Sequence, residues 1–322
     1  IFALAPFLGI AVVIAFLDVR FAGQRETARF GFSLLERLGI VGRAIAWYAG
    51  KVVCPYPLMT FYPRWSVAIP PLWPLLFPAA IGAALIGLWA ARKRIGRGPL
   101  ALTLYFCVTL GPVLGLIDFH FMSFAFVADR FQYLASAGLI VFVCSAALRC
   151  RERLPAPGGR VLATGFGYAI LTLLTFLTFL QSSLYRDNET LFRYNVAWNP
   201  NAWGARNILG VAIESRARSA ADWDEAMDHY RKAVEANPDF PDARNNYGMA
   251  LGRRGLYDEA IEQFRAAIRV KPNSAEAWGN MGYAMLSKGD PTGAVESLKK
   301  AVELQPDSPT FHLNLGYARL AL

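Results

Sequence analysis

The sequence predicts an all-α chain made of a polytopic helical membrane domain, residues 1–186, and an α-solenoid of helical repeats, residues 203–322. A linker is expected at residues 187–202. Long apolar segments occur only in the first part, and prolines recur every 34 residues in the second. The first part carries 17 Lys and Arg against 6 Asp and Glu, whereas residues 187–322 carry 16 against 18. The repeats therefore lack the basic excess of a nucleic-acid-binding domain, and no nucleic-acid partner is predicted.

Four apolar segments in the first part are long enough to cross a hydrocarbon core, which takes about 20 helical residues. They are residues 71–91, 100–117, 131–148 and 161–181. Residues 1–17 have the same composition, but the chain opens inside that segment. We therefore expect a fragment whose first membrane helices are missing and whose last repeat is cut at its end.

Two clusters of basic residues set the expected orientation. Arg and Lys gather at 92–97 and again at 149–160, and such clusters stay on the cytoplasmic side of a bilayer. The loop at 118–130 then faces outward. One further crossing, residues 161–181, puts the repeats on the outer side. We therefore expect an integral protein of a bacterial inner membrane whose repeats lie in the periplasm.

Residues 33–53 predict an amphipathic helix that lies in the membrane interface. At 100° per residue, four charged side chains fall in one sector and six apolar ones in the opposite sector. The alternative is a spanning helix with snorkelling ends, which would have to keep Arg43 within the lipid at some cost. The charged sector holds Glu36, Arg37, Arg43 and Lys51, and the apolar sector holds Leu34, Leu38, Val41, Ile45, Tyr48 and Val52.

Known catalytic and metal-binding signatures are missing from the sequence. The four cysteines have no CxxC spacing and the three histidines are scattered, so no disulfide framework, metal site or bound cofactor is predicted. There is no HExxH, Walker, GxGxxG or Gly-x-Ser-x-Gly sequence either. The chemistry of soluble hydrolases, kinases and dehydrogenases therefore has no support.

Small residues recur with the prolines in the second part. Each repeat is expected to form two helices that touch at Gly and Ala and end before Pro, which cannot continue the hydrogen-bond ladder. This pattern resembles the tetratricopeptide repeat (TPR). Full repeats are expected at 203–240, 241–274 and 275–308, with a partial one at 309–322. The first is four residues longer than the others. The recurring columns are Gly210, Gly248, Gly282 and Gly316; Ala226, Ala260 and Ala294; Ala233, Ala267 and Ala301; and Pro238, Pro272 and Pro306.

Stacked TPR units curve into a groove lined by the first helices, which can hold a polypeptide acceptor or a partner protein. Polar side chains on these helices are candidates for hydrogen bonds to an extended peptide. The alternative is an ordinary solvated surface. The candidates are Arg206, Asn207, Arg244, Asn245, Trp278, Asn280, His312 and Asn314.

Two stretches of the first part and a third at its junction with the linker, followed by TPR repeats, resemble a family of membrane enzymes. They are residues 50–63 (GKVVCPYPLMTFYP), 127–138 (VADRFQYLASAG) and 185–192 (YRDNETLF). In this order they are similar to the transmembrane, TPR-containing glycosyltransferases related to protein O-mannosyltransferases, which share the GT-C fold. The resemblance implies a partial GT-C-like membrane domain.

The resemblance also implies protein O-mannosylation, in which a sugar moves from a polyprenyl-phosphate donor to Ser or Thr hydroxyls. The family's catalytic acidic residue would lie upstream of Ile1, so the catalytic residues of this chain are unknown, and the need for a divalent metal is open. The leaving phosphate is an anion that Arg stabilises through charge-assisted hydrogen bonds. Membrane lipids are expected partners, and the expected donor contacts are Arg130, Asp129, His120, Arg64 and Lys51.

Two alternatives accompany these expectations. The Asp129–Arg130 pair can instead be a helix N-cap with a snorkelling neighbour. The whole protein can be a non-enzymatic, membrane-anchored TPR scaffold for an envelope or secretion complex.

Overall fold

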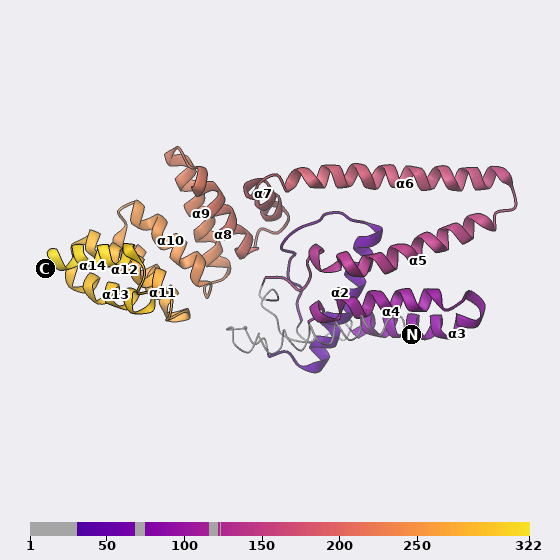
Figure 1. Cartoon of the computed structure of the whole chain (residues 1–322), viewed down its shortest axis with the longest axis horizontal. Coiled ribbons are helices and arrows are strands. Elements are labelled where there is room, and N and C mark those ends of the chain that lie inside the picture. Colours follow the sequence, from indigo (N-terminus) through magenta and orange to yellow (C-terminus); the bar gives the residue numbers. More distant parts are fainter. Residues whose placement is uncertain (1–30, 68–74, 116–121, 123) are drawn as a thin grey trace. The chain divides into compact units, whose positions relative to one another are not determined.

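The computed structural model describes residues 31–67, 75–115, 122 and 124–322. Every regular element in these ranges is a helix, as the sequence predicts. The chain divides into two compact units, Ile1–Leu184 and Tyr185–Leu322, and each is described by itself (Figure 1).

The first unit contains five helices within its described residues. They are α2 (Leu34–Val53), α3 (Leu76–Ile95), α4 (Gly98–Leu110), α5 (Tyr133–Glu152) and α6 (Pro157–Leu184). Short 3-10 turns, η3 (Gly111–Val113) and η5 (Asp129–Gln132), follow α4 and precede α5.

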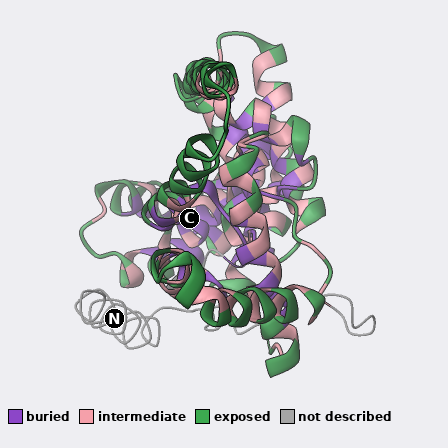
Figure 2. Cartoon of the chain, turned by 90° about the vertical axis from the view of Figure 1, so that its right-hand side faces the viewer, coloured by how far each residue is buried: buried purple, intermediate pink, exposed green. Residues whose placement is uncertain are grey.

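Three helical segments of this unit are long and apolar enough to cross a membrane: α3, η5 with α5, and α6. No residue of α3 or α6 is buried within the protein (Figure 2). Large exposed apolar surfaces of this kind are rare in soluble monomers and are typical of contact with lipid or with another protein. The predicted segment at 1–17 lies outside the described residues.

The prediction of a spanning helix at 100–117 is wrong. α4 ends at Leu110 after 13 residues and gives way to the 3-10 turn Gly111–Val113. Pro112 has no N–H to donate to the helical ladder, and glycine has a low helix propensity. The hydropathy of the segment continues past this point, but the helix does not.

Helix α2 begins with a capping box, in which Ser33 accepts from the Glu36 amide and the Glu36 carboxylate accepts from the Ser33 amide. Its buried face differs in part from the predicted apolar sector. Ile45 and Tyr48 are buried, whereas Leu34 is 71% exposed and Leu38 37% exposed. Whether α2 lies in the interface or spans the membrane stays a prediction.

The mid-helix Arg43 of α2 has partners within the protein. Its Nη1 donates to the Ser66 carbonyl oxygen at 3.1 Å, and its guanidinium lies 4.7 Å from the centroid of the Trp65 ring. These local contacts lower the cost of keeping the Arg43 side chain within a membrane segment.

The second unit is a stack of helix pairs. α8 (Trp203–Arg216), α10 (Pro241–Arg253), α12 (Ala275–Lys288) and α14 (Pro309–Leu320) are first helices, and α9 (Ala220–Ala236), α11 (Tyr257–Val270) and α13 (Pro291–Leu304) are second helices. The predicted close contact at glycine is confirmed. A Cβ placed on Gly210, Gly248 or Gly282 would lie 2.6–2.7 Å from Tyr230, Phe264 or Leu298 of the paired helix.

Most of the predicted linker at 187–202 is the helix α7 (Asn188–Trp198). The Asp187 side chain caps this helix by accepting from the Thr190 amide at 2.7 Å. α7 is followed by Pro200, as α9 is followed by Pro238. Phe192 is buried and precedes Pro200 by the same eight positions as Tyr230 precedes Pro238. α7 therefore takes the place of a second helix ahead of the first complete repeat.

Candidate functional site

Asparagine side chains link neighbouring first helices of the second unit. Asn246 Nδ2 on α10 donates to Asn207 Oδ1 on α8 at 2.9 Å, and Asn280 Nδ2 on α12 donates to Asn245 Oδ1 on α10 at 3.0 Å. We call these four residues the asparagine ladder. Three of them were predicted groove residues. Asn246 was missed, although it follows Pro238 by the same eight positions as Asn280 follows Pro272.

The ladder changes at its next step. Asn314 has the offset of Asn246 and Asn280, but the residue that would accept from it is Gly279, which has no side chain. The space there is taken by Phe311, because a Cβ on Gly279 would lie only 2.3 Å from its Cε1. Phe311 replaces the alanine found at this offset in the other repeats. Ring packing therefore joins α14 to α12 where amides join the earlier helices.

Four predicted groove residues instead contact the turns between repeats. Each lies six positions after a proline and approaches the carbonyl oxygen of that proline, so each stabilises the turn that precedes its own helix. The prediction that they also contact a peptide stays a prediction. The contacts are Arg206 Nε to Pro200 O at 2.5 Å, Arg244 Nε to Pro238 O at 2.5 Å, Trp278 Nε1 to Pro272 O at 2.9 Å, and His312 Nε2 to Pro306 O at 2.7 Å.

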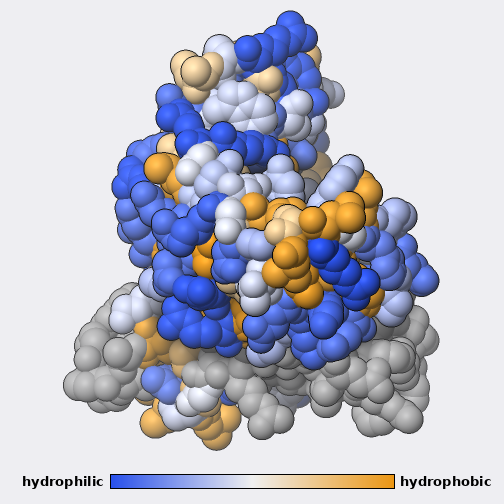
Figure 3. All heavy atoms as spheres, turned by 90° about the vertical axis from the view of Figure 1, so that its left-hand side faces the viewer, coloured by the Kyte–Doolittle hydropathy of each residue, from blue (hydrophilic) through white to orange (hydrophobic). Residues whose placement is uncertain are grey.

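A row of exposed apolar or aromatic side chains runs beside the ladder. Val211, Tyr283 and Tyr317 are each about half exposed, and Met249 occupies the same offset in α10. This offset is four residues beyond Asn207 and Asn245, so both rows lie on one face of the first helices. The contact of Asn245 Nδ2 with Met249 Sδ at 3.8 Å agrees. Further exposed leucines lie near the C-terminus, including Leu313 and Leu320, and hydrophobic atoms show there among hydrophilic ones (Figure 3).

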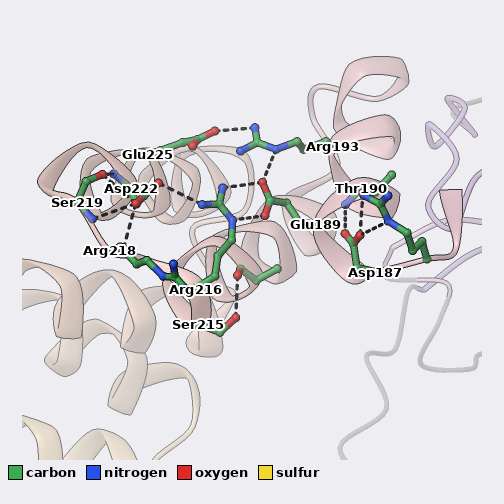
Figure 4. Close-up of polar contacts among 12 residues, drawn as sticks. Asp187, Glu189, Thr190, Arg193, Ser215, Arg216, Arg218, Ser219, Asp222 and Glu225 are labelled. Atoms are coloured by element: carbon green, nitrogen blue, oxygen red, sulfur yellow. Dashed lines mark hydrogen bonds and ion pairs between the residues drawn. The ribbon is translucent and has the colours of Figure 1, made fainter. Parts of the chain in front are cut away.

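Ion pairs join α7 to the first complete repeat (Figure 4). The residues that form them, which we call the clasp, are Glu189, Arg193, Arg216, Asp222 and Glu225. The Arg216 guanidinium binds the Glu189 carboxylate, with Nη2 2.8 Å from Oε1, and also Asp222, with Nη1 3.2 Å from Oδ1. Arg193 of α7 bridges Glu189, at 2.8 Å, and Glu225 of α9, at 2.6 Å. The four extra residues of the first repeat lie in this region.

The clasp perturbs the titration of its carboxylates. The hydrogen bonds from Arg216 lower the pKa of Glu189 to about 2, against an opposing effect of burial. The Arg218 and Ser219 backbone amides and the Ser219 hydroxyl lower the pKa of Asp222. A cavity of about 620 Å³ lies beside the clasp, between α7 and α8, and includes Val211 and Ser215 in its lining. The cavity therefore places residues of α7 beside Val211 of α8.

In the first unit, Asp129 is the centre of a buried polar cluster. Its carboxylate accepts from the Tyr62 hydroxyl at 3.0 Å and from the Met59 amide at 2.9 Å, and the residue is 7% exposed. The Lys51 ammonium donates to the Pro57 carbonyl and lies 5.4 Å from the Trp47 and Tyr62 ring centroids. The cluster fixes the loop after α2 against the start of α5.

This geometry decides one of the two predictions for the Asp129–Arg130 pair. Asp129 makes no side-chain cap to η5 or α5, so it is not the expected N-cap. The prediction that Asp129 contacts the donor phosphate stays a prediction. The neighbouring Arg130 is exposed, and its guanidinium lies 5.2 Å from the centroid of the Phe131 ring.

The other expected donor contacts are not all brought together. Lys51 shares the cluster with Asp129, but Arg64 packs its guanidinium 5.0 Å from the Phe126 ring centroid. His120 lies outside the described residues. Within the described ranges, no group of three or more His, Cys, Asp and Glu side chains is placed to hold a metal ion.

Comparison with known proteins found matches to the second unit. The tetratricopeptide repeat family matches residues 215–275, 248–309 and 280–322. No curated protein matches the chain.

Similar solved structures are TPR proteins. The Sgt2 TPR domain from Aspergillus fumigatus is 24% identical, covering 37% of this chain and 77% of that one, with a TM-score of 0.34. MamA from Desulfovibrio magneticus RS-1 is 22% identical, covering 45% and 82%, with a TM-score of 0.39. The first TPR of Spaghetti (RPAP3), bound to an HSP90 peptide, is 20% identical, covering 37% and 91%, with a TM-score of 0.35.

These matches concern the repeats, so the resemblance of the first unit to GT-C glycosyltransferases stays a prediction. The chain is an all-helical protein that carries tetratricopeptide repeats, a module for protein–protein interaction, in its second unit.

Proposed function

We propose that the repeats bind an extended polypeptide along the first helices, on the face that carries the asparagine ladder. The ladder is the observation that carries this proposal. Each asparagine amide has two donor hydrogens and an oxygen with two lone pairs, and a pair in the ladder uses only one donor and one acceptor. The remaining groups match the N–H and C=O of an extended backbone. The half-exposed Val211 and Tyr283 supply adjacent apolar contact.

Site-specific photo-crosslinking tests this proposal. The detergent-solubilised chain would carry a photoreactive phenylalanine analogue at Tyr283 or, as the control, at Val270, which is 40% exposed on the second helix α11. We expect a pool of random-sequence peptides to crosslink at position 283 and much less at 270. Equal yields at the two positions would contradict a groove on the first helices.

We further propose that the whole protein is a membrane glycosyltransferase that moves a sugar, mannose in the related family, from polyprenyl phosphate to polypeptides held by the repeats. The exposed Arg130, next to the anchored Asp129, supports a phosphate contact at the start of the apolar helix α5. An arginine held in place at a developing anion stabilises the leaving phosphate without reorganisation. This proposal puts the repeats and Arg130 on the extracytoplasmic side of the membrane.

The test is transfer of radiolabelled mannose from polyprenyl-phosphate mannose to peptide by full-length protein. Arg130→Ala is expected to lower turnover by about a hundredfold or more, whereas Arg94→Ala, an exposed change in a basic cluster, should not. Unchanged turnover in Arg130→Ala would exclude the assigned role.

A scaffold for an envelope or secretion complex is the second candidate, favoured by the match of the repeats alone. Two results together would favour the scaffold. The full-length protein would show no transferase activity, and deletion of residues 188–322 would abolish a specific assembly. For the enzyme, the same deletion should lower turnover of protein acceptors more than that of short peptides.

A further inference from the structure

The face of the first helices that we propose to bind polypeptide carries acidic side chains that form no ion pair with any residue the structure describes. We infer that its partner is an extended segment with Lys or Arg side chains among small polar and apolar ones. This inference rests on the proposed peptide-binding role of the repeats and adds the charge of the ligand.

Asp242 and Glu276 provide the negative charge. Both are exposed, and each lies in the first turn of its helix, α10 or α12. Asp242 precedes Asn245 and Asn246 by three and four positions, and Glu276 precedes Asn280 by four. Residues at these spacings share one face of a helix. The two carboxylates therefore lie on the same face as the asparagine ladder, one on each of two adjacent first helices.

The cations of the first helices do not balance this charge, because they are held elsewhere. Arg216 binds Glu189 and Asp222, Arg253 binds Glu214, and Lys288 binds Asp258. Arg206 and Arg244 keep their positive charge, because a carbonyl is neutral, but their guanidinium groups donate to proline carbonyls in the turns that precede α8 and α10.

Among the Lys and Arg residues of α8, α10, α12 and α14, all of which the structure describes, only Arg319 in the last turn of α14 has no such partner. A peptide on the ladder therefore meets uncommitted carboxylates and amides but few uncommitted cations. An acidic segment would be repelled and would leave its own charges without partners.

The remaining surface fits the other side chains of such a segment. Val211, Met249, Tyr283 and Tyr317 form the apolar row beside the ladder. Tyr283 and Tyr317 also offer ring faces, which attract Lys and Arg. An extended chain points successive side chains in opposite directions. One side can therefore contact the apolar row while cations on the chain reach Asp242 and Glu276.

Calorimetric titration of the detergent-solubilised 322-residue chain tests the inference with three synthetic peptides. They share a Thr-, Ser-, Val- and Ala-based sequence with blocked ends, and carry interspersed Lys, Gln or Glu. We expect the Lys peptide to bind most tightly and the Glu peptide least. The difference should shrink between about 0.05 and about 0.5 M NaCl, because salt screens exposed charges.

Charge-neutralising variants identify the carboxylates responsible. Asp242→Asn with Glu276→Gln should weaken binding of the Lys peptide roughly two- to thirtyfold, since each exposed ion pair contributes little, and leave the Gln peptide unaffected. The control is Glu259→Gln with Glu296→Gln, two exposed carboxylates on second helices, which makes the same change in net charge and should alter neither. Tighter binding of the Glu peptide, or equal effects of both pairs, overturns the inference but leaves peptide binding intact. Binding of none of the peptides overturns both proposals.

Discussion

The Tyr62 hydroxyl lies 3.0 Å from both carboxylate oxygens of Asp129, residues 67 positions apart in the chain. The contact is buried and ties the loop after α2 to the start of α5. Asp129 thus acts through position: it holds in place the backbone that presents Arg130. The Met59 amide completes the same arrangement by donating to Asp129 Oδ2 at 2.9 Å.

Removing this carboxylate should destabilise the first unit. Asp129→Ala removes the carboxylate acceptor of the Met59 amide and the Tyr62 hydroxyl, which keep their contact with each other and, for Tyr62, the Pro57 carbonyl. The hydrogen bonds lost should therefore cost about 1–3 kcal/mol in total. Asp129→Asn keeps one acceptor oxygen and should cost less. Thermal unfolding in detergent, followed by tryptophan fluorescence, measures the effect. A midpoint for Asp129→Ala no lower than that of the exposed control Arg130→Ala would contradict the anchoring role.

The contact between Gly279 and Phe311 predicts a coupled pair of mutations. Gly279→Ala puts a methyl group 2.3 Å from the Phe311 ring and should cost about 1–3 kcal/mol through overpacking. The same change combined with Phe311→Ala should show little extra cost beyond that of Phe311→Ala alone. Urea denaturation followed by circular dichroism gives the coupling free energy.

Gly316→Ala is the matched control, since no atom lies within 4 Å of the added methyl. It should raise stability by up to about 1 kcal/mol, because alanine favours the helix. Additive effects of Gly279→Ala and Phe311→Ala would show that the two residues do not meet.

Glu189 should give the second unit an acid-sensitive contribution to stability. Its pKa is lowered to about 2 in the folded chain, below the value of about 4.3 for an unperturbed glutamate. The contribution is therefore complete above about pH 4.3 and is lost as the pH falls toward about 2. Glu189→Gln should remove this part of the pH dependence. The measurement is urea stability at several pH values, with Glu303→Gln, an exposed residue of a surface pair on α13, as the control. Equal pH profiles for Glu189→Gln and the unmodified chain would refute the clasp.

The asparagine ladder should contribute to stability where it is paired. Asn246→Ala leaves the Asn207 side chain, which is 8% exposed, without its donor, and is expected to cost about 1–3 kcal/mol. Asn314→Ala changes the same offset where glycine stands opposite, and should cost less. Thermal unfolding by circular dichroism compares them, and equal losses would argue against a ladder.

Much of the helical architecture could be predicted from the sequence because it depends on patterns of residues that are close together in the chain. The 34-residue proline interval and the glycine column fix the repeats, since each column reports one close contact, such as that between Gly248 and Phe264. α7 was missed because Asn195 replaces alanine in its column, although Phe192, Pro200 and the Asp187 cap were visible signals.

The candidate sites were less predictable, because they depend on partners far apart in the chain. Nothing near Asp129 in the sequence indicates Tyr62 or Met59. The type of residue at 206, 244, 278 and 312 suggested free polar groups, yet each meets a proline carbonyl. Hydropathy likewise extended α4 past Leu110, since it does not register the backbone cost of Gly111 and Pro112.

The Phe311 ring has a consequence for how this array can evolve. Its space exists because residue 279 is glycine, whereas the earlier first helix has Asn245 at that offset. If duplication or recombination placed the last helix directly behind α10, the ring would collide with that asparagine. Successive units are therefore not interchangeable modules: their order is encoded in matched side chains, and rearrangement requires paired substitutions.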